Sequence, residues 1–401
     1  MADNRTVTEN GKSFMIPYGR HSINQQDIDH VVDVLKGGWL TCGPVVEAFE
    51  EELAAVTGAK YAISCSNGTT ALHLAMLALG IKEGDTILVP AITFLASANA
   101  VRYVGADVVF VDVDPTTGLM TAETLKAAIL LHRSKNLKAL VNVHFAGQCE
   151  NLEAIYTVAK EYNLLIIEDA AHAVGTAYID SKGKNHPIGS NAFSDITTFS
   201  FHPVKTIAMG EGGALTTNDS KIAEALKLYR SHGMVRDPLK WETPKLSGPW
   251  YYEMQDLGYN YRISDINCAL GLNQLKRLQD FKAERARLVR AYDEAFSSIP
   301  HVTPLRKLGY SDTAWHLYSV LIDYAAIGKS RTQVMNYLKD NAIGTQVHYT
   351  PLYHQPYYKK LYGDMKLPGA EKYYEGCLSL PLYVGLMESE QRLVIEKVLT
   401  V

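Results

Sequence analysis

The chain has 401 residues, of which 47% are hydrophobic and 20% charged, and its formal net charge is −4. This length suggests about two or three domains, and this composition excludes a chain that is disordered along most of its length. The near balance of charges gives no basis for broad binding to nucleic acid or to an anionic membrane surface. We therefore expect neither as a partner.

The five cysteines are scattered and show no spacing typical of metal ligands, which favours reduced thiols in a cytoplasmic protein. The histidines show no paired spacing with nearby acids, so we expect no metal site. The N-terminal residues 1–12 are polar and lack the apolar core of a signal peptide. No apolar run is long enough to span a bilayer. These features predict a cytoplasmic protein without a membrane-embedded part.

From residue 60 to residue 218, short β-branched runs alternate with amphipathic segments. Seven runs predict strands, at residues 61–66, 86–91, 107–113, 139–144, 164–169, 196–200 and 213–217. Five segments predict helices, at residues 69–79, 96–104, 122–132, 152–162 and 221–231. Near-continuous apolar strands separated by helices indicate an α/β fold with a mostly parallel sheet covered on both faces. In such a sheet, ligands bind at the carboxyl ends of the strands.

Two segments follow this alternating region. Residues 237–259 are rich in Pro, Trp, Tyr and Gly, and we interpret them as an ordered loop rather than a linker, because aromatic side chains favour packed surroundings. Residues 264–296 carry apolar side chains at helical spacing, with charged residues between them. This pattern predicts one long amphipathic helix.

The C-terminal part of the chain predicts a second, smaller α/β unit. Its expected elements are a strand over 316–323, a helix over 330–341, a strand over 345–348 and a last helix from near Ser389. We therefore expect a large domain with an N-terminal arm over residues 1–262. Residues 263–401 would hold the long connecting helix and the small C-terminal domain.

One lysine follows the sixth predicted strand. That strand ends at Ser200, and the turn His202-Pro203 leads to Lys205 and then to a glycine cluster at 210–213. A lone loop lysine is normally a solvated charge, but this one follows a buried run and precedes glycines, where backbone can approach a ligand closely. A lysine that forms a Schiff base has to be desolvated enough to be an unprotonated nucleophile. Lys205 is therefore the candidate catalytic residue.

Asp169 ends the apolar run 164–169, and a carboxylate at that depth needs a partner. It is either an ordinary helix cap at a strand–helix junction or the partner of a pyridine nitrogen in a bound cofactor. His172, one turn on, could hold this carboxylate, lie near the ring or be merely structural. A lysine amine and such a carboxylate are the minimum equipment for pyridoxal 5′-phosphate (PLP) chemistry. The sequence predicts PLP binding if the two segments lie side by side.

The segment 66–70, Ser-Asn-Gly-Thr-Thr, precedes a predicted helix. Glycine, hydroxyls and a helix N-terminus are typical of an anion cup, although an ordinary threonine cap explains the pattern equally well. Ser200 and the glycines at 210–213 could complete a phosphate site. Phe94 follows another predicted strand and could stack on a cofactor ring, although an aromatic residue there more often belongs to the core.

Other nucleotide and hydrolase motifs do not fit. The glycine cluster at 210–213 lacks the spacing of a dinucleotide-binding loop and precedes a strand rather than following one. The sequence has no Walker lysine motif, no His-Glu-x-x-His and no Gly-x-Ser-x-Gly.

Six motifs occur together in this chain: Trp39-Leu40-Thr41-x-Gly43-Pro44, Asn67-Gly68-Thr69-x-Ala71-Leu72-His73, Glu168-Asp169-Ala170-Ala171-His172, Ser200-Phe201-His202-Pro203-x-Lys205, Gly210-Glu211-Gly212-Gly213 and Gly258-Tyr259-Asn260-Tyr261-Arg262. With them, the sequence resembles the sugar-nucleotide aminotransferases of the DegT/DnrJ/EryC1/StrS family from about residue 16 to the C-terminus. The resemblance implies PLP as cofactor. It also implies PLP-dependent transferase fold type I, which is aspartate-aminotransferase-like, with a large seven-stranded sheet domain and a smaller C-terminal domain.

The same resemblance implies roles for individual residues. Lys205 would carry the cofactor, Asp169 would contact its ring nitrogen, and Ser200 with Gly68 and Thr69 would bind its phosphate. Phe94 and His172 would be neighbours of the ring. Asn260 would reach the cofactor phosphate of a partner subunit, which implies a homodimer with shared active sites. The implied candidates for contact with the substrates are Tyr18, Trp39, Thr41, Arg262, His316, Tyr318, His348 and Tyr349.

Segments 16–20, 200–205 and 348–358 are similar to the branch of the family that makes pseudaminic acid precursors. This similarity implies transfer of the amino group of glutamate to the 4-keto carbon of a UDP-linked 6-deoxy-N-acetyl-hexos-4-ulose. Family members with histidine in place of the lysine are dehydratases, so Lys205 favours transamination. The alternatives are another nucleotide-linked ketosugar, or a non-catalytic PLP-binding regulator on the same fold. Cys42 and the segment 207–209 depart mildly from the family pattern.

Overall fold

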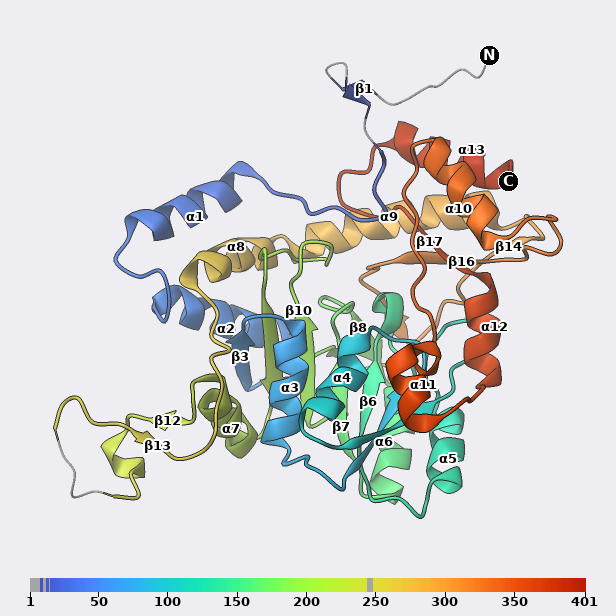
Figure 1. The fold of residues 1–401 in the computed structure, drawn as a ribbon. Helices are drawn as coiled ribbons and strands as arrows, with labels where there is room; N and C mark the ends of the chain where they lie inside the picture. The colour runs from blue at the N-terminus through green and yellow to red at the C-terminus, as the bar shows by residue number, and fades with distance from the viewer. Residues whose placement is uncertain (1–7, 10–11, 14, 244–247) are drawn as a thin grey trace.

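A seven-stranded sheet forms the centre of the protein (Figure 1). The structure is a computed structural model that describes residues 8–9, 12–13, 15–243 and 248–401. The strands are β3 (Tyr61–Cys65), β4 (Thr86–Pro90), β5 (Asp107–Val111), β6 (Leu137–Val143), β7 (Leu165–Asp169), β10 (Ile196–Ser200) and β11 (Gly213–Thr217). They lie in the order β3-β11-β10-β7-β6-β4-β5. From β10 to β5 all neighbours are parallel, and β11 is antiparallel to both β10 and β3. The expected mostly parallel sheet is confirmed.

Helices cover both faces of this sheet, which explains why its strands are runs of apolar residues. One face packs against α3 (Gly68–Ala78), α4 (Leu95–Tyr103) and α7 (Ser220–Arg230). The other face packs against α2 (Pro44–Thr57), α5 (Ala122–Leu131) and α6 (Leu152–Glu161). Along β4, Ile87 and Val89 face the first group and Leu88 faces the second, as the two-residue period of a strand requires.

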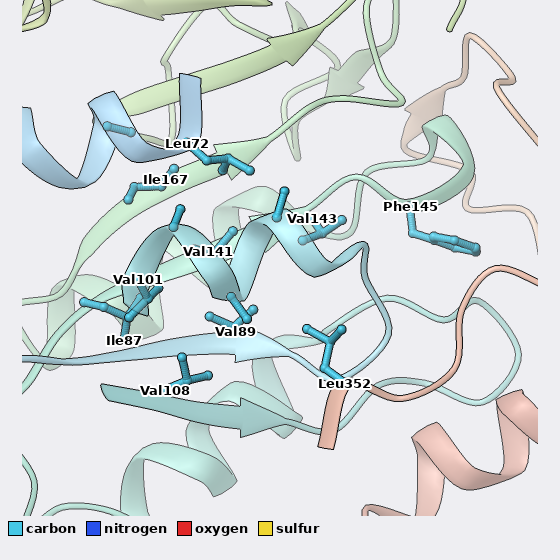
Figure 2. Close-up of a cluster of buried hydrophobic side chains, with 14 of the residues drawn as sticks. Leu72, Ile87, Val89, Val101, Val108, Val141, Val143, Phe145, Ile167 and Leu352 are labelled. Atoms are coloured by element: carbon cyan, nitrogen blue, oxygen red, sulfur yellow. The ribbon is translucent and has the colours of Figure 1, made fainter. Parts of the chain in front are cut away.

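The core on the first face extends to a segment from near the C-terminus. Figure 2 shows Val89 and Val141 of the sheet packed with Leu72 of α3 and Val101 of α4. Leu352 belongs to the same cluster, and its N–H donates to Ala91 O, just after β4, at 3.0 Å. The C-terminal part of the chain is therefore held against the carboxyl end of the sheet, where ligands bind in folds of this class.

The C-terminal part has its own antiparallel sheet, in the order β14 (Val302–Pro304), β16 (Tyr318–Ile322) and β17 (Cys377–Leu380). The helices of this part are α10 (Arg331–Asp340), α11 (Pro356–Tyr362), α12 (Pro368–Gly376) and α13 (Glu388–Leu399). Apolar residues of α10 and α13 form one buried cluster with this sheet. We propose that the chain forms two domains, residues 1–262 and residues 263–401.

The single helix predicted over residues 264–296 is wrong, because the structure divides it into α8 (Asp265–Lys276) and α9 (Leu278–Phe296). Arg277 between them has φ −100° and ψ 7°, outside the helical range. Its guanidinium contacts Asp27 and lies 4.8 Å from the ring centre of Phe281. This long-range ion pair is invisible to the apolar periodicity. In Figure 1, α9 runs from α8 into the C-terminal part.

The strand predicted over residues 345–348 is also wrong. This segment forms only an isolated bridge between Gln346 and Ser379. The N-terminal arm lies close by, because the N–H of Ile16 donates to Ala342 O at 2.8 Å. The arm then leads to α1 (Gln25–Lys36).

The remaining elements are short. They are β1 (Thr8–Glu9), β2 (Lys12–Ser13), η1 (Phe145–Gly147), β8 (Ala177–Ile179), β9 (Asn185–Pro187), β12 (Met234–Val235), η2 (Pro238–Lys240), β13 (Glu253–Met254), β15 (Ser311–Asp312) and η3 (Leu352–His354). The loop predicted over 237–259 is ordered where it is described; residues 244–247 lie outside the described residues. Trp241 packs edge-on against Tyr251, but Trp250 is 79% exposed in the single chain, so the expected packing of the aromatic residues is only partly met. No helix within the described ranges has the length and apolarity needed to cross a membrane.

Candidate active site

A cavity of about 640 Å³ lies at the carboxyl ends of the central strands. Strand ends and helix starts of the large sheet form one wall, and residues from the N-terminal arm and the C-terminal part form the other. The predicted site residues that line it are Tyr18, Gly68, Thr69, Phe94, Asp169, His172, Ser200, Lys205, His316, His348 and Tyr349. The structure thus brings together side chains that are far apart in the sequence, from Tyr18 in the N-terminal arm to Tyr349 in the C-terminal part.

Lys205 lies in the turn that follows β10, and its N–H donates to His202 O at 2.8 Å. Its side chain lines the cavity and is part-buried. Burial lowers the pKa of the Lys205 amine from 10.5 to about 8, and the negative charge of Asp169 opposes this decrease. Desolvation disfavours the charged amine, whereas a nearby anion favours it. At pH 7 about a tenth of the Lys205 amine is therefore an uncharged nucleophile, compared with less than about a thousandth at the ordinary pKa of 10.5.

This pKa predicts how the apoenzyme takes up PLP. The rate of covalent attachment is expected to rise about tenfold per pH unit below pH ~8 and to level off above it, because only the neutral amine attacks a carbonyl carbon. Stopped-flow absorbance of apoenzyme mixed with PLP measures this rate. In Asp169→Asn the midpoint should move to lower pH, since the charge that opposes the decrease is gone. A midpoint near 10.5, the ordinary lysine value, would contradict the assignment.

Asp169 is the last residue of β7 and is 6% exposed. Its Oδ1 accepts the N–H of Ala171 at 3.2 Å, and its Oδ2 accepts the hydroxyl of Ser97 at 2.7 Å. No helix among the described elements starts directly after Asp169, so the helix-cap interpretation does not apply. The carboxylate lines the same cavity as Lys205, as its predicted contact with a cofactor ring requires.

The start of α3 forms an anion cup beside these two residues. Asn67 caps the helix by accepting the N–H of Thr70 at 2.9 Å. Gly68 and Thr69, the next residues of the first turn, line the cavity together with Ser200. A Cβ on Gly68 would lie only 2.7 Å from Cβ of Ser200, so only glycine lets the helix start approach the end of β10 this closely. The N–H groups of a first helical turn, with a nearby hydroxyl, bind a phosphate.

Three buried histidines and an aromatic pair line the rest of the cavity. His172 Nδ1 accepts the N–H of Ala146 at 3.3 Å, and its Nε2 lies 3.3 Å from Tyr349 Oη. The neutral ring thus carries its hydrogen on Nε2 and donates it to Tyr349. Phe94 lies 6.1 Å from the Tyr349 ring, and the ring centres of His172 and His316 are 4.3 Å apart. His172 therefore serves as an oriented neutral donor rather than as a cation.

The three histidines share one electrostatic property. Burial, and then the positive charge of Lys205, lower the pKa of His348 from 6.5 to about 3. Burial and neighbouring positive groups likewise lower the pKa values of His172 and His316 well below 6.5. All three are therefore neutral in the folded protein at neutral pH.

These histidines predict acid sensitivity. Below pH ~6.5 the unfolded chain binds more protons than the folded one, so this stabilisation is complete above pH ~6.5 and is lost as pH falls. As the pH falls below ~6.5, each histidine lowers the free energy of unfolding by up to about 1.4 kcal/mol for each pH unit. Urea denaturation of the apoenzyme between pH 8 and pH 5 measures the slope, which His316→Asn should reduce. A free energy of unfolding that stays constant over this range would contradict the prediction.

Five predicted site residues do not line the cavity of the single chain. Trp39 and Thr41 lie on the surface before α2, and Trp39 is 62% exposed. Asn260 is exposed and Arg262 is part-buried, in a segment held beside the anion cup by the bond from Ser66 N to Tyr261 O, 2.9 Å. Tyr318 is the clearest departure.

The structure places Tyr318 inside the C-terminal core. It is 3% exposed, stacks on Tyr292 with ring centres 4.6 Å apart and donates its hydroxyl to Asp293. Strand residues alternate between two faces, and Tyr318 stands on the face of β16 that packs against α9. Contrary to the prediction, Tyr318 therefore belongs to the C-terminal core and does not line the cavity.

Sequence reasoning missed several residues of the cavity. Thr93, Glu211, Gln346 and Gln355 line it. Thr93 and Ser97 flank Phe94 at a spacing of four residues, and this pair of hydroxyls around a candidate ring neighbour was the available signal. Gln355 lies in the segment 348–358, which was cited for the family branch, but it was not predicted to be a site residue. Gln346 had no signal, because its place depends on the fold of the C-terminal part.

The cavity fits PLP. The helix start with its glycine accommodates a phosphate, the part-buried amine of Lys205 accommodates an aldehyde, and Asp169 supplies a negative charge for a ring nitrogen. On a mostly parallel sheet of this topology, these features define a PLP-dependent enzyme with the aspartate-aminotransferase fold.

The chain belongs to the DegT/DnrJ/EryC1/StrS aminotransferase family, whose model matches residues 21–399. It is similar to the spore coat polysaccharide biosynthesis protein SpsC of Bacillus subtilis, with 39% identity over 390 residues, 96% of this chain and 97% of that protein. It is also similar to a UDP-4-amino-4,6-dideoxy-N-acetyl-beta-L-altrosamine transaminase of Campylobacter jejuni, with 38% identity, 92% of this chain and 93% of that protein.

Solved structures agree with this membership. PseC of Helicobacter pylori, an aminotransferase involved in the biosynthesis of pseudoaminic acid, is 29% identical, with a TM-score of 0.86 over 96% of this chain and 98% of that chain. The putative sugar aminotransferase Spr1654 of Streptococcus pneumoniae, in its PLP form, is 28% identical, with a TM-score of 0.84 over 96% and 98%. The expected family, fold and cofactor are confirmed: the protein is a PLP-dependent sugar aminotransferase.

Proposed function

We propose that this enzyme transfers the amino group of glutamate to the 4-keto carbon of a UDP-linked 6-deoxy-N-acetyl-hexos-4-ulose, in the biosynthesis of pseudaminic acid. The observation that carries the proposal is the similarity, over 92% of the chain, to proteins named UDP-4-amino-4,6-dideoxy-N-acetyl-beta-L-altrosamine transaminase. The similarity to PseC of Helicobacter pylori supports it.

The residues of the cavity divide the work of such a reaction. When bound, PLP supplies the electron sink through which an amino group is exchanged between two substrates. Lys205 holds the cofactor and is the base that takes the α-proton of the amino donor and returns a proton to C4 of the sugar; its lowered pKa suits both steps. Asp169 presents a fixed negative charge to the ring nitrogen. Gly68, Thr69 and Ser200 bind the phosphate.

The opposite wall is proposed to receive the substrates. Tyr18, His316, His348 and Tyr349 line the cavity from the N-terminal arm and the C-terminal part. His348 Nδ1 lies 2.8 Å from Ser379 Oγ, which fixes the ring orientation. Neutral imidazole and phenol groups can hydrogen-bond to sugar hydroxyls and to an acetamido group without adding charge. Phe94 and His172 would lie against the cofactor ring.

We further propose a homodimer whose subunits complete each other's sites. Asn260, Trp39 and Thr41 are exposed in the single chain, and Phe94, which lines the cavity, is 55% exposed. Exposed aromatic side chains next to a binding site are typical of a surface that a partner covers. Asn260 would then reach the cofactor phosphate of the other subunit, and Arg262 would contact an anionic group of a substrate. Light scattering that finds a monomer would contradict this proposal.

A different nucleotide-linked ketosugar is the second candidate. The similarity to SpsC, a spore coat polysaccharide biosynthesis protein, favours it, because a surface glycan can require another amino sugar. We place the enzyme in the cytoplasm in either case. All five cysteines, Cys42 and four buried ones, are free thiols, which is typical of a reducing compartment.

The two candidates are separated by a panel of ketosugars. Purified holoenzyme is incubated with glutamate and, in parallel, with UDP-linked 6-deoxy-N-acetyl-hexos-4-uloses of different configuration and with dTDP-linked 3-keto and 4-keto sugars, and formation of 2-oxoglutarate is measured. The proposal expects the highest kcat/KM with the UDP-linked 4-keto N-acetyl sugar whose amination gives the altrosamine configuration. A preference for another ketosugar by tenfold or more would overturn it in favour of the second candidate.

A further inference from the structure

The buried hydroxyls of Thr93 and Ser97 form a chain of hydrogen bonds that ends on the carboxylate of Asp169. Ser97 Oγ lies 2.7 Å from Asp169 Oδ2, and Thr93 Oγ1 lies 2.7 Å from Ser97 Oγ. An ionised carboxylate only accepts hydrogen bonds, so Ser97 gives its single hydroxyl hydrogen to Asp169. Only the lone pairs of Ser97 are then left for the other bond, so Thr93 is the donor in it. The hydroxyls therefore point one after the other toward the carboxylate.

This chain of hydrogen bonds is shielded from water. Ser97 is fully buried, Thr93 is 1% exposed and Asp169 is 6% exposed. Hydrogen bonds to a charged group are strong, and low-dielectric surroundings strengthen them further. The other carboxylate oxygen accepts the N–H of Ala171. Each oxygen of Asp169 thus has its own donor, and together the two donors fix the carboxylate plane.

This chain of hydrogen bonds starts in the segment that forms part of the cavity wall. Phe94 is the N-cap residue of α4, and it lines the cavity together with Thr93. Ser97, in the first turn of α4, donates its hydroxyl to Asp169. Ser97 itself does not line the cavity. In the described structure, the only hydrogen-bond partners of its hydroxyl are Thr93 and Asp169.

We propose that Ser97 is a positioning residue which, supported by Thr93, holds Asp169 in the orientation that meets the ring nitrogen of PLP. The proposal rests on the function of Asp169 proposed above. Without the Ser97 hydroxyl, Asp169 keeps its charge but loses its fixed orientation. The ring nitrogen is then protonated less firmly, and the cofactor binds more weakly.

The test compares Ser97→Ala with Thr93→Val, Ser97→Thr and Asp169→Asn. We expect Ser97→Ala to lower kcat of the glutamate half-reaction roughly tenfold at unchanged KM, since a hydrogen bond to a charged group is worth about one to two factors of ten. The dissociation constant of PLP should rise by a similar factor. Thr93→Val should have a smaller effect of the same kind, and Ser97→Thr, which restores the hydroxyl, should recover most of the loss.

The second readout is the pH midpoint of the visible absorbance of the lysine-linked cofactor. A protonated ring nitrogen is a positive charge that disfavours protonation of the nitrogen bonded to Lys205. When Asp169 is held less well, this effect weakens, so the midpoint should move to higher pH in Ser97→Ala, in the same direction as in Asp169→Asn but by less. A purely structural role of Ser97 would not move this midpoint.

The matched control is Ser64→Ala. Ser64 is also fully buried and donates its hydroxyl to a carboxylate, that of Glu50, at 2.6 Å, but neither residue lines the cavity. This variant should lower the melting temperature and leave PLP affinity and the absorbance midpoint unchanged. If Ser97→Ala behaves like Ser64→Ala while Asp169→Asn is impaired, the role of Ser97 is overturned alone. If Asp169→Asn retains the wild-type rate and midpoint, the role of Asp169 is overturned and this proposal with it.

Discussion

Replacing Lys205 with alanine is expected to lower turnover by at least ~10⁴-fold, because the variant loses the group that holds the cofactor and the base that moves the proton. The visible absorbance of the covalently held cofactor should disappear as well. Steady-state formation of 2-oxoglutarate from glutamate, with an absorbance spectrum of the purified variant, measures both effects. Lys205→Arg keeps a positive charge but offers no neutral amine at pH 8, and it should be equally inactive.

Lys221→Ala is the control for this prediction. Lys221 is exposed at the start of α7 and does not line the cavity, so its removal should leave turnover and spectrum unchanged. A Lys205→Ala variant that folds, binds PLP and retains more than a few per cent of the wild-type rate would contradict the role of Lys205.

Asp169→Asn is expected to have the second-largest effect, a fall of about 10²- to 10³-fold in the rate of the glutamate half-reaction. Asparagine has nearly the same shape but no negative charge, so the ring nitrogen loses the partner that keeps it protonated. Removing one preorganised electrostatic contact in an active site costs a factor of this order. Single-turnover absorbance after mixing the holoenzyme with glutamate measures the rate directly.

Asp112→Asn is a matched control for this substitution. Asp112 also follows a strand of the central sheet, and it accepts the N–H groups of Gly369 and Ala370 at 2.9 and 2.8 Å, away from the cavity. It should lower stability and leave the half-reaction of the folded enzyme unchanged. A half-reaction rate in Asp169→Asn within threefold of the wild type would contradict the proposed role of Asp169.

The central sheet could be predicted from the sequence because its signal is local. Each strand is a short, buried, β-branched run, and two of the seven predicted runs, 196–200 and 213–217, match β10 and β11 to the residue. The split at Arg277 and the irregular segment 345–348 could not be predicted. Their conformations depend on contacts with residues far away in the chain, such as Asp27 and Ser379, which leave the local pattern unchanged.

Some residues of the candidate site could likewise be predicted from the sequence, and others could not. Asp169 ends the apolar strand β7, and Lys205 lies in the turn after β10, before a glycine cluster. Their residue types and positions therefore already indicated that they belong to the site. Ser97 and Thr93 flank Phe94, but a serine in a helix and a threonine before it are common in sequence, so this signal was weak. Only the approach of α4 to β7 shows that Ser97 hydrogen-bonds to Asp169 and Thr93 to Ser97. The prediction of Tyr318 as a substrate contact failed because the strand face on which a residue lies depends on the register of the strand. The resemblance to the family does not specify this register.

The residue to which PLP is attached is the most direct evidence for the position of the active site. The holoenzyme is reduced with borohydride, digested and mapped by mass spectrometry for the phosphopyridoxyl group. We predict that the label lies on the peptide containing Lys205, at one group per chain, and that it is absent after the same treatment of Lys205→Ala. A label on another lysine, or one spread over several exposed lysines, would contradict the assignment of this cavity as the active site.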